Sequence, residues 1–190
     1  MNLPDTKIYS AVIKQIGDTY RQCKYTGEKL PSIGGRKPTK EEEKVFFEAA
    51  RYWDKKLGYY IPSDQIKASI VNASKKFKVP GEGKMSFWRY TGSGIFIEPA
   101  KIPLNKDAKV EIGGHFVKDK KGATKWTTYC EISNWKAEFQ ITNVFPEKIT
   151  DDYLENFLKY AGSFIGIGTN RPELGKPHGK FEVIKFGITK

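Results

Sequence analysis

Apolar and polar residues alternate strictly over residues 135–142. A period of two predicts a β-strand with one buried face. Weaker alternation predicts a first strand over residues 7–16, which Gly17 ends, and a last strand over residues 180–188. We therefore expect β-structure near both ends of the sequence and again in its second half.

Two other segments are expected to be β-structure. Residues 85–98 hold the turn Gly92-Ser93-Gly94 between two β-prone runs, which predicts a hairpin or a bent strand pair. Residues 108–132 combine apolar positions on one side with a lysine-rich turn, which predicts a β-rich insertion. Residues 18–38 are polar and rich in Gly and Pro, so we expect them to form a long loop.

Helical periodicity begins after Thr39. Thr39 and Glu42 form a capping box, and the apolar stripe that follows predicts a helix over residues 40–56. Ser63 follows a proline and is the expected N-cap of a second, lysine-bearing helix over residues 63–78.

A third helix is expected over residues 150–165, with Thr150 as its cap and two aspartates at its positive end. With the insertions and the helix at 40–56 set aside, the order of elements is β, α, β, β, α, β. This is the split-βαβ plan of ferredoxin-like and RRM-like folds. We therefore predict one α+β domain over residues 1–190, with β-rich insertions and one extra N-terminal helix. Its antiparallel sheet would carry helices on one face and leave the other free for a ligand.

The charge balance favours a polyanionic partner. The 190 residues include 33 Lys and Arg against 22 Asp and Glu, which gives a formal net charge of +11. Residues 67–90 alone hold six cations and a single acid, Glu82. Single-stranded nucleic acid, RNA or DNA, is the expected partner, and a merely soluble basic surface is the alternative.

The sequence predicts no metal site, disulfide framework or cofactor. Cys23 and Cys130 are far apart, and His115 and His178 are the only histidines, so a closed zinc site is not indicated. No stretch approaches the roughly 18 apolar residues that span a bilayer, and the first residues lack a signal-peptide pattern. We expect a soluble cytoplasmic protein with no membrane partner.

Basic and aromatic residues are interleaved in two segments, 84–90 and 120–126. Surfaces that bind single strands have this composition, because cations follow phosphates while rings stack on unpaired bases. Alternatively, these segments are edge strands whose rings lie in the core. The candidate contacts are Trp88, Arg89, Lys120, Lys121 and Trp126.

Two further segments could hold phosphates. The helix at 63–78 offers N-terminal amides and lysines, and the Gly-rich segment 166–175 would let backbone and cations approach a phosphate closely. The alternative for the Gly-rich segment is a helix C-cap and a turn into the last strand, because its spacing fits neither a dinucleotide fingerprint nor a Walker A loop. The candidates are Ser63, Lys67, Lys75, Lys76, Lys78, Arg171, Lys176 and Lys180. We expect these cations to converge into a continuous positive track on one side of the sheet.

Two short motifs and the order of elements carry a family resemblance. One motif is the extended run 59–62 that enters a helix at Ser63, and the other is the Gly-rich segment 166–175 that leads into Gly179-Lys180-Phe181. Over roughly residues 59–188 the chain resembles the RAMP superfamily. Its best-known members are the Cas7-type backbone proteins of CRISPR effector complexes, and relatives also occur in phages and prophages.

This resemblance implies a protein that coats single-stranded RNA through its phosphate backbone, as a homo-oligomeric filament or within a multi-subunit ribonucleoprotein. The loop 18–38 and the insertion 108–132 would then be the finger- and thumb-like contacts to a neighbouring copy. Affinity is expected to fall with salt, because phosphate contacts release counterions.

Other functions stay open. A Cas6-like, metal-independent RNA endonuclease would use a histidine in acid–base cleavage, and His178 beside Lys176 is the candidate. Some Cas7-type subunits cut RNA with an aspartate in the loop after the first strand, where Asp18 lies. We predict no catalytic residue from these two candidates alone. A phage protein that imitates or caps a Cas7 filament is a further alternative, as is a role in virion assembly.

Overall fold

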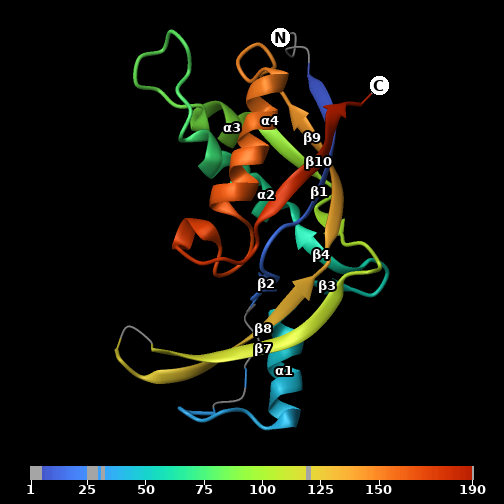
Figure 1. Cartoon of the computed structure of the whole chain (residues 1–190), viewed down its shortest axis with the longest axis vertical. Coiled ribbons are helices and arrows are strands. Elements are labelled where there is room, and N and C mark those ends of the chain that lie inside the picture. Colours follow the sequence, from blue (N-terminus) through green and yellow to red (C-terminus); the bar gives the residue numbers. More distant parts are fainter. Residues whose placement is uncertain (1–5, 25–29, 31–32, 119–120, 190) are drawn as a thin grey trace.

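The computed structural model describes residues 6–24, 30, 33–118 and 121–189. Its largest sheet has four antiparallel strands in the order β10-β1-β9-β5 (Figure 1). The strands are β1 (Lys7–Gln15), β5 (Ile95–Glu98), β9 (Lys136–Asn143) and β10 (Phe181–Ile188). The helix α2 (Ser63–Ser74) lies between β1 and β5 in the chain, and α4 (Asp151–Tyr160) lies between β9 and β10. This strand order confirms the predicted α+β, ferredoxin-like core.

The helices cover one face of this sheet. Tyr9, Ala11 and Ile13 of β1 are fully buried, and they pair across the sheet with buried apolar residues of β9. The strict alternation in the sequence is seen directly in β9, where Ala137, Phe139 and Ile141 are buried and Lys136, Glu138 and Gln140 are exposed. The apolar positions of α2 and α4 pack on these strands and enclose the core.

The opposite face of the sheet has balanced charge. Lys14 of β1 is paired directly with Lys136 of β9 and with Glu182 of β10, and its ammonium lies 2.8 Å from the Glu182 carboxylate. Because alternate residues share a face, three lysines and three glutamates project from it. They are Lys14, Lys136, Lys185, Glu98, Glu138 and Glu182. The expected positive track therefore does not run across this open face.

A second sheet extends from the core as a long arm (Figure 1). It pairs β7 (Lys109–Lys118) with β8 (Thr124–Ser133), and the short β2 (Tyr20–Gln22) adds to the other side of β8. The helix α1 (Lys40–Ala50) packs against β8. The β-rich insertion is thus confirmed, while the strand β2 lies inside the segment that we expected to be entirely loop.

Short elements complete the structure. A small sheet joins β3 (Trp53–Asp54), β4 (Gly58–Pro62) and β6 (Lys101–Pro103). The capping box forms as predicted, because Thr39 accepts from the Glu42 amide and Glu42 accepts from the Thr39 amide. That first helix ends at Ala50, well before residue 56, since the chain turns into β3.

The hairpin predicted for residues 85–98 is wrong. Residues Trp88–Gly94 form the helix α3, and only Ile95–Glu98 is a strand. The buried Thr91 hydroxyl lies 2.7 Å from the Ser74 hydroxyl of α2 and so fixes α3 on α2. The glycine at the end of α3, Gly94, lies so close to Phe145 that a Cβ would be 2.3 Å from its ring. These contacts are long-range, and the residues Gly92-Ser93-Gly94, which are typical of a turn, gave no sign of them.

The predicted bounds of the other two helices also need correction. Pro62, not Ser63, is the N-cap of α2; Ser63 is the first helical residue, and its amide donates to the Ala100 carbonyl. The helix ends at Ser74 rather than at residue 78. The helix expected at 150–165 is α4 followed by the π-helical turn Ala161–Ile165.

An ion pair at the start of α4 makes stability depend on pH. The carboxylate of Asp151 accepts from the Lys7 ammonium at 2.9 Å and from the Tyr9 hydroxyl at 2.8 Å. The hydrogen bond from Lys7, followed by that from Tyr9, lowers the pKa of Asp151, while burial and then Asp151 raise the pKa of Tyr9 to about 12. A depressed carboxyl pKa stabilises the fold above the unfolded value of about 4, and this contribution is lost as pH falls through the folded value.

We expect Asp151→Asn to lower the free energy of unfolding at pH 7 by about 0.5–1 kcal/mol, since half-exposed pairs are screened. The difference from the parent protein should shrink as pH falls below the unfolded pKa of about 4. Urea unfolding across this range measures it. The control is Asp152→Asn, which removes a charge from the same helix end and should cost less at pH 7; an equal cost would contradict a specific role for Lys7 and Tyr9.

Candidate nucleic-acid interface

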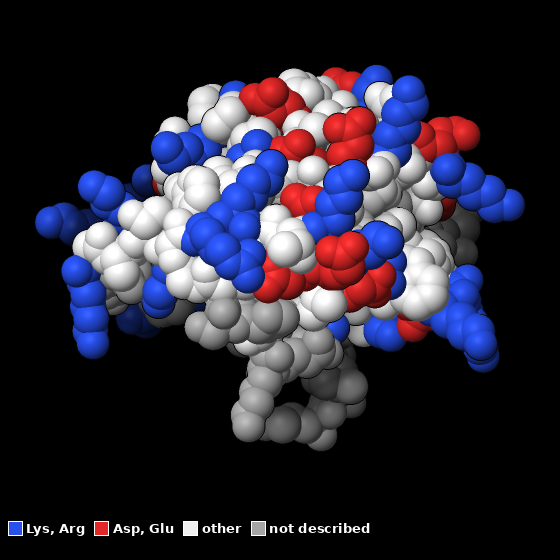
Figure 2. All heavy atoms as spheres, turned by 90° about the horizontal axis from the view of Figure 1, so that it is seen from below, with Lys and Arg blue, Asp and Glu red and all other residues white. Residues whose placement is uncertain are grey.

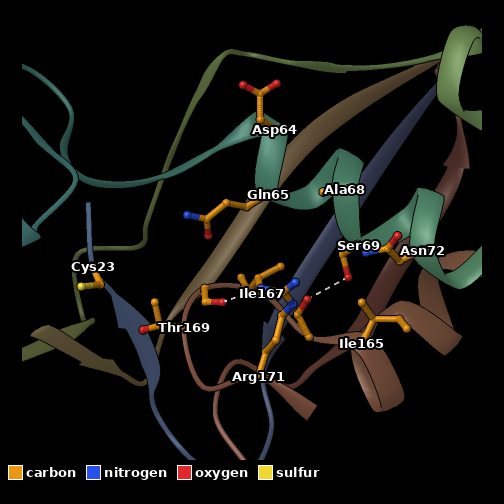
Figure 3. A pocket seen from close by; sticks show the side chains of 12 residues that line it. Cys23, Asp64, Gln65, Ala68, Ser69, Asn72, Ile165, Ile167, Thr169 and Arg171 are labelled. Atoms are coloured by element: carbon orange, nitrogen blue, oxygen red, sulfur yellow. Dashed lines mark hydrogen bonds between the residues drawn. The ribbon is translucent and has the colours of Figure 1, made fainter. Parts of the chain in front are cut away.

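A groove separates α2 from the Gly-rich loop that follows the π-helical turn, and Figure 3 shows the side chains on its two walls. Its volume is about 270 Å³. We call it the α2 groove, and its lining residues are Cys23, Asp64, Gln65, Ala68, Ser69, Asn72, Ile165, Gly166, Ile167, Gly168, Thr169 and Arg171.

The helical wall follows from the spacing of small and polar residues in α2. Positions 64, 65, 68, 69 and 72 recur with the period of one helix face, next to the buried stripe that holds Ile66 and Ile70. The Ser69 hydroxyl donates to the Gly166 carbonyl at 3.0 Å, which ties the helix to the loop (Figure 3). The groove therefore has two walls held at a fixed separation.

The loop wall takes its path from glycines. The Gly166 amide donates to the Ala161 carbonyl at 2.7 Å with φ at 72°, so Gly166 ends the helix as a C-cap. At Gly168, a Cβ would lie 2.4 Å from the Arg21 carbonyl oxygen of β2. These glycines are required for backbone packing, which is the C-cap and turn that the sequence also allowed.

Hydrogen-bonding side chains lie on both walls of the groove among apolar ones, and Asp64 and Arg171 give its lining one charge of each sign. The Gln65 side-chain oxygen accepts from the Tyr20 hydroxyl at 2.8 Å, and the same side chain also interacts with Tyr52. Arg171 is the cation on the loop wall; its guanidinium donates to the Gly168 carbonyl and forms an ion pair with Glu173 at 2.8 Å. The groove thus has hydrogen-bonding groups suited to a neutral polar group such as a sugar, with the acid Asp64 on its helical wall and the cation Arg171 on its loop wall.

Two predicted lysines border α2 on different sides. The Lys75 ammonium lies 2.7 Å from the side-chain oxygen of Asn72, at the end of the groove. The Lys67 ammonium lies 4.8 Å from the centre of the Phe96 ring of β5, at the sheet edge. Lys76 is exposed in the loop after α2.

Other predicted contacts lie farther from the groove. Lys78 donates to the Lys84 carbonyl at 2.9 Å and so organises the loop between α2 and α3. Trp88, 46% exposed, and the exposed Arg89 both lie in α3. Lys180 is half-buried just before β10, and its carbonyl accepts from the Ile16 amide.

The arm carries the remaining basic and aromatic candidates. Trp126 of β8 packs edge-on against Phe116, its indole N–H donates to Thr128 at 3.0 Å, and the Lys37 ammonium lies 5.5 Å from its ring centre. Lys121 is exposed at the arm's turn, and Lys120 lies outside the described residues. Trp126 is therefore a half-buried packing residue.

The predicted cations lie on several separate elements. In Figure 1 the loop between α2 and α3, the Gly-rich loop and the far end of the arm all lie to the left. Figure 2 shows the lower end of the molecule, where Lys and Arg are spread around the face with Asp and Glu among them. Arg171 lines the α2 groove and Lys75 bonds to its lining residue Asn72, whereas the α3 and arm candidates lie on other elements.

The two catalytic candidates come close together. His178 follows the Gly-rich loop, and its ring nitrogen Nδ1 lies 3.3 Å from the Thr19 hydroxyl. The charge of Asp18 raises the pKa of His178, although burial and then Arg21 lower that pKa overall. Within the described residues no group of three or more His, Cys, Asp or Glu side chains is arranged to hold a metal ion.

Sequence reasoning missed several residues of the α2 groove. Gln65, Asn72 and Thr169 lie on its walls, although none of them was a candidate. Only the groove residues of α2 had a signal in the sequence, because small and polar residues recur there beside the apolar stripe. Thr169 could not be inferred, because its hydroxyl and amide are placed by the Arg21 carbonyl of a strand 148 residues away.

Comparisons with known proteins locate the fold. No family model matches the chain, and a search of curated proteins finds no match. A solved chain from the structure of the type III-B Cmr-beta bound to cognate target RNA is similar over 97% of this chain, with a TM-score of 0.52 and 14% sequence identity. This chain spans 61% of that chain's length. The likeness supports the ferredoxin-like core and its arrangement.

Among the described residues, no helix has the length and apolar character needed to cross a bilayer.

Proposed function

We propose that this protein binds single-stranded RNA through the sugar–phosphate backbone along the α2 groove. The observation that carries the proposal is a groove with hydrogen-bonding groups on both walls, Arg171 in its lining and Lys75 beside it, in a fold similar to a chain of an assembly solved with its target RNA. The net charge of +11 on this chain supplies the long-range attraction that polyanion binding requires.

The two kinds of group in the groove have different roles. Lys75, Lys76 and Arg171 hold phosphates by charge, which gives affinity without base readout. The amide groups of Gln65 and Asn72 lie where a ribose can reach them, and a 2′-hydroxyl both donates and accepts hydrogen bonds. The groove should therefore prefer RNA over DNA of the same sequence.

Copies of the chain would then line up along one strand as a multi-copy ribonucleoprotein. The arm formed by β7 and β8 is long enough, at ten residues per strand, to reach beyond the core. Its exposed Phe116 and the edge of Trp126 give it an aromatic surface for a neighbouring copy or for an unstacked base.

We expect the double variant Lys75→Glu/Lys76→Glu to weaken binding of a 30-nucleotide RNA by about tenfold or more, because it removes two phosphate contacts and adds repulsion. Fluorescence anisotropy at 50 and 200 mM salt measures the affinity and its salt slope. The slope of log affinity against log salt should become shallower by between one and two.

The matched control is Lys55→Glu/Lys56→Glu, an identical charge change in the exposed turn between β3 and β4. It should reduce affinity by less than about threefold through net charge alone. Equal losses in both double variants would show that binding is diffuse and would contradict the groove. Tighter binding to DNA than to RNA would contradict the role given to Gln65 and Asn72.

A further inference from the structure

The strand β10, red in Figure 1, is one edge of the four-stranded sheet, because among the described residues it pairs with β1 alone. The outer amides and carbonyls of an edge strand can pair with the backbone of another strand. The apolar side chains of Ile184 and Ile188 are exposed along this strand. We call this side of the sheet the β10 edge.

A β-bulge changes which residues of β10 share a face. The register of β10 on β1 shifts between Val183 and Lys185, so Ile184 is an extra residue without a partner in β1. In a regular strand, side chains three positions apart project from opposite faces. Here Glu182 and Lys185 lie opposite positions 14 and 12 of β1, which share a face because they are two residues apart. The bulge therefore brings Glu182 and Lys185 to the same, open face of the sheet.

These two residues give the β10 edge one charge of each sign. The Glu182 carboxylate lies 2.8 Å from the Lys14 ammonium, and both side chains are about half exposed. Lys185 is exposed, and the β1 residue directly opposite it is the apolar Val12. Because half-exposed ion pairs are weak, the Glu182 carboxylate can accept a second cation from outside the chain.

We propose that two copies of this chain form a dimer by pairing their β10 edges antiparallel, which joins the two four-stranded sheets into one. A two-fold axis makes the contact the same on both copies, so each contact between two different positions occurs twice. In this dimer Glu182 of each copy lies opposite Lys185 of the other. Two ion pairs across the axis then accompany the backbone hydrogen bonds between the strands.

The bulge selects the register of this pair. Directly opposite residues of antiparallel strands share a face, so residues on the open face of one copy must meet residues on the open face of the other. An axis between positions 183 and 184 places Glu182 opposite Lys185 on the open face, and Phe181 opposite Phe186 on the helical face. A shift by one residue in either direction would place both charges opposite apolar side chains. Without the bulge, Glu182 and Lys185 would project from opposite faces and could not meet across the axis.

The same features favour a second copy over any other strand. A bulge and an exposed lysine at a sheet edge oppose pairing with an arbitrary strand. A second copy supplies an acid opposite that lysine and carries the same bulge. A two-fold contact is closed after two copies, so it does not extend into a fibre. The residues that line the α2 groove lie outside β10, so both copies keep that groove for RNA.

The test measures self-association of the full-length protein by sedimentation equilibrium, after nuclease treatment so that no RNA links the copies. The parent protein should show an equilibrium between monomer and dimer. Glu182→Lys and Lys185→Glu should each weaken the dimer by about tenfold or more, because each variant places like charges opposite one another at two symmetric positions. An equimolar mixture of the two variants should restore the affinity of the parent protein, because one variant then presents two cations to the two acids of the other. Damage to the fold of either variant could not be repaired by mixing.

The matched control is Lys136→Glu, the same charge change on the same face but in the inner strand β9. It should change the dimer affinity by less than about threefold, because β9 lies two strands, or about 10 Å, from the edge. A parent protein that stays monomeric at about 100 μM would overturn the proposal, since even a weak dimer forms at that concentration. A mixture of the two variants that stays monomeric would also overturn it, as would species larger than a dimer that grow with concentration.

Fluorescence anisotropy keeps this inference separate from the proposed function. Lys185→Glu should bind RNA within about threefold of the parent protein, because the α2 groove lies outside β10. A dimer that does not bind RNA would overturn the RNA-binding proposal and leave the β10 edge intact. A monomer that binds RNA would do the opposite.

Discussion

Replacing Gly179 by alanine is expected to destabilise the protein by about 3 kcal/mol or more. The backbone at Gly179 has φ at +74°, a conformation that costs an L-residue about 1–2 kcal/mol. A Cβ there would also lie 1.9 Å from the Ile167 carbonyl oxygen, so the backbone of the Gly-rich loop has to move. That movement opposes the hydrogen bond from the Ile167 amide to the Gly179 carbonyl. Urea unfolding measures the loss.

Substitutions at two other glycines distinguish backbone strain from steric crowding by the added Cβ. Gly81 has nearly the same φ, +75°, but a Cβ there would meet nothing within 4 Å, so Gly81→Ala should cost only about 1–2 kcal/mol. Gly92 lies in α3 with open space around it, and Gly92→Ala should stabilise the protein by about 0.5–1 kcal/mol. If Gly179→Ala cost no more than Gly81→Ala, the close approach of the loop to itself would be disproved.

The same substitution also tests the loop wall of the α2 groove. Residues 165–169 lie on that wall, and the Gly179 carbonyl accepts from the Ile167 amide within it. A loop displaced by Gly179→Ala should therefore weaken RNA binding, which fluorescence anisotropy measures.

Local patterns in the sequence were sufficient to predict the core of the fold. The alternation at 135–142 is β9, and the capping box at Thr39 and Glu42 begins α1 as predicted. Both patterns involve residues close together in the chain, and each has a direct physical cause in burial or in unsatisfied amides. The ferredoxin-like order followed from them, because the two insertions were recognisable as β-rich or loop-like segments.

Long-range contacts decided what the sequence did not predict. The segment around Gly92 became a helix because Thr91 bonds to Ser74 across two elements. The pairing of β2 with β8 brings Arg21 opposite Glu131. A strand of three residues inside a Gly- and Pro-rich segment gives no periodic signal, so this pairing was not predictable.

Truncating Phe157 is the other change with a large expected effect. Phe157 of α4 is fully buried, and its ring centre lies 5.0 Å from that of Phe77 and 5.2 Å from that of Phe87. Phe77 follows the end of α2 and Phe87 precedes α3, so one side chain joins three helices. Phe157→Ala should lower the free energy of unfolding by about 3–5 kcal/mol through lost burial and the cavity left behind.

The control is Phe164→Ala in the π-helical turn, where the ring is 60% exposed and contacts Tyr160 at 4.7 Å between centres. It should cost less than about 1 kcal/mol, because little apolar area leaves water at that position. Hydrogen exchange adds a second measurement: amides of α2 should lose protection in Phe157→Ala, since the end of that helix is held through Phe77. A small loss in Phe157→Ala with unchanged exchange in α2 would show that the helix is held to the sheet alone, and the wall of the α2 groove would then be independent of α4.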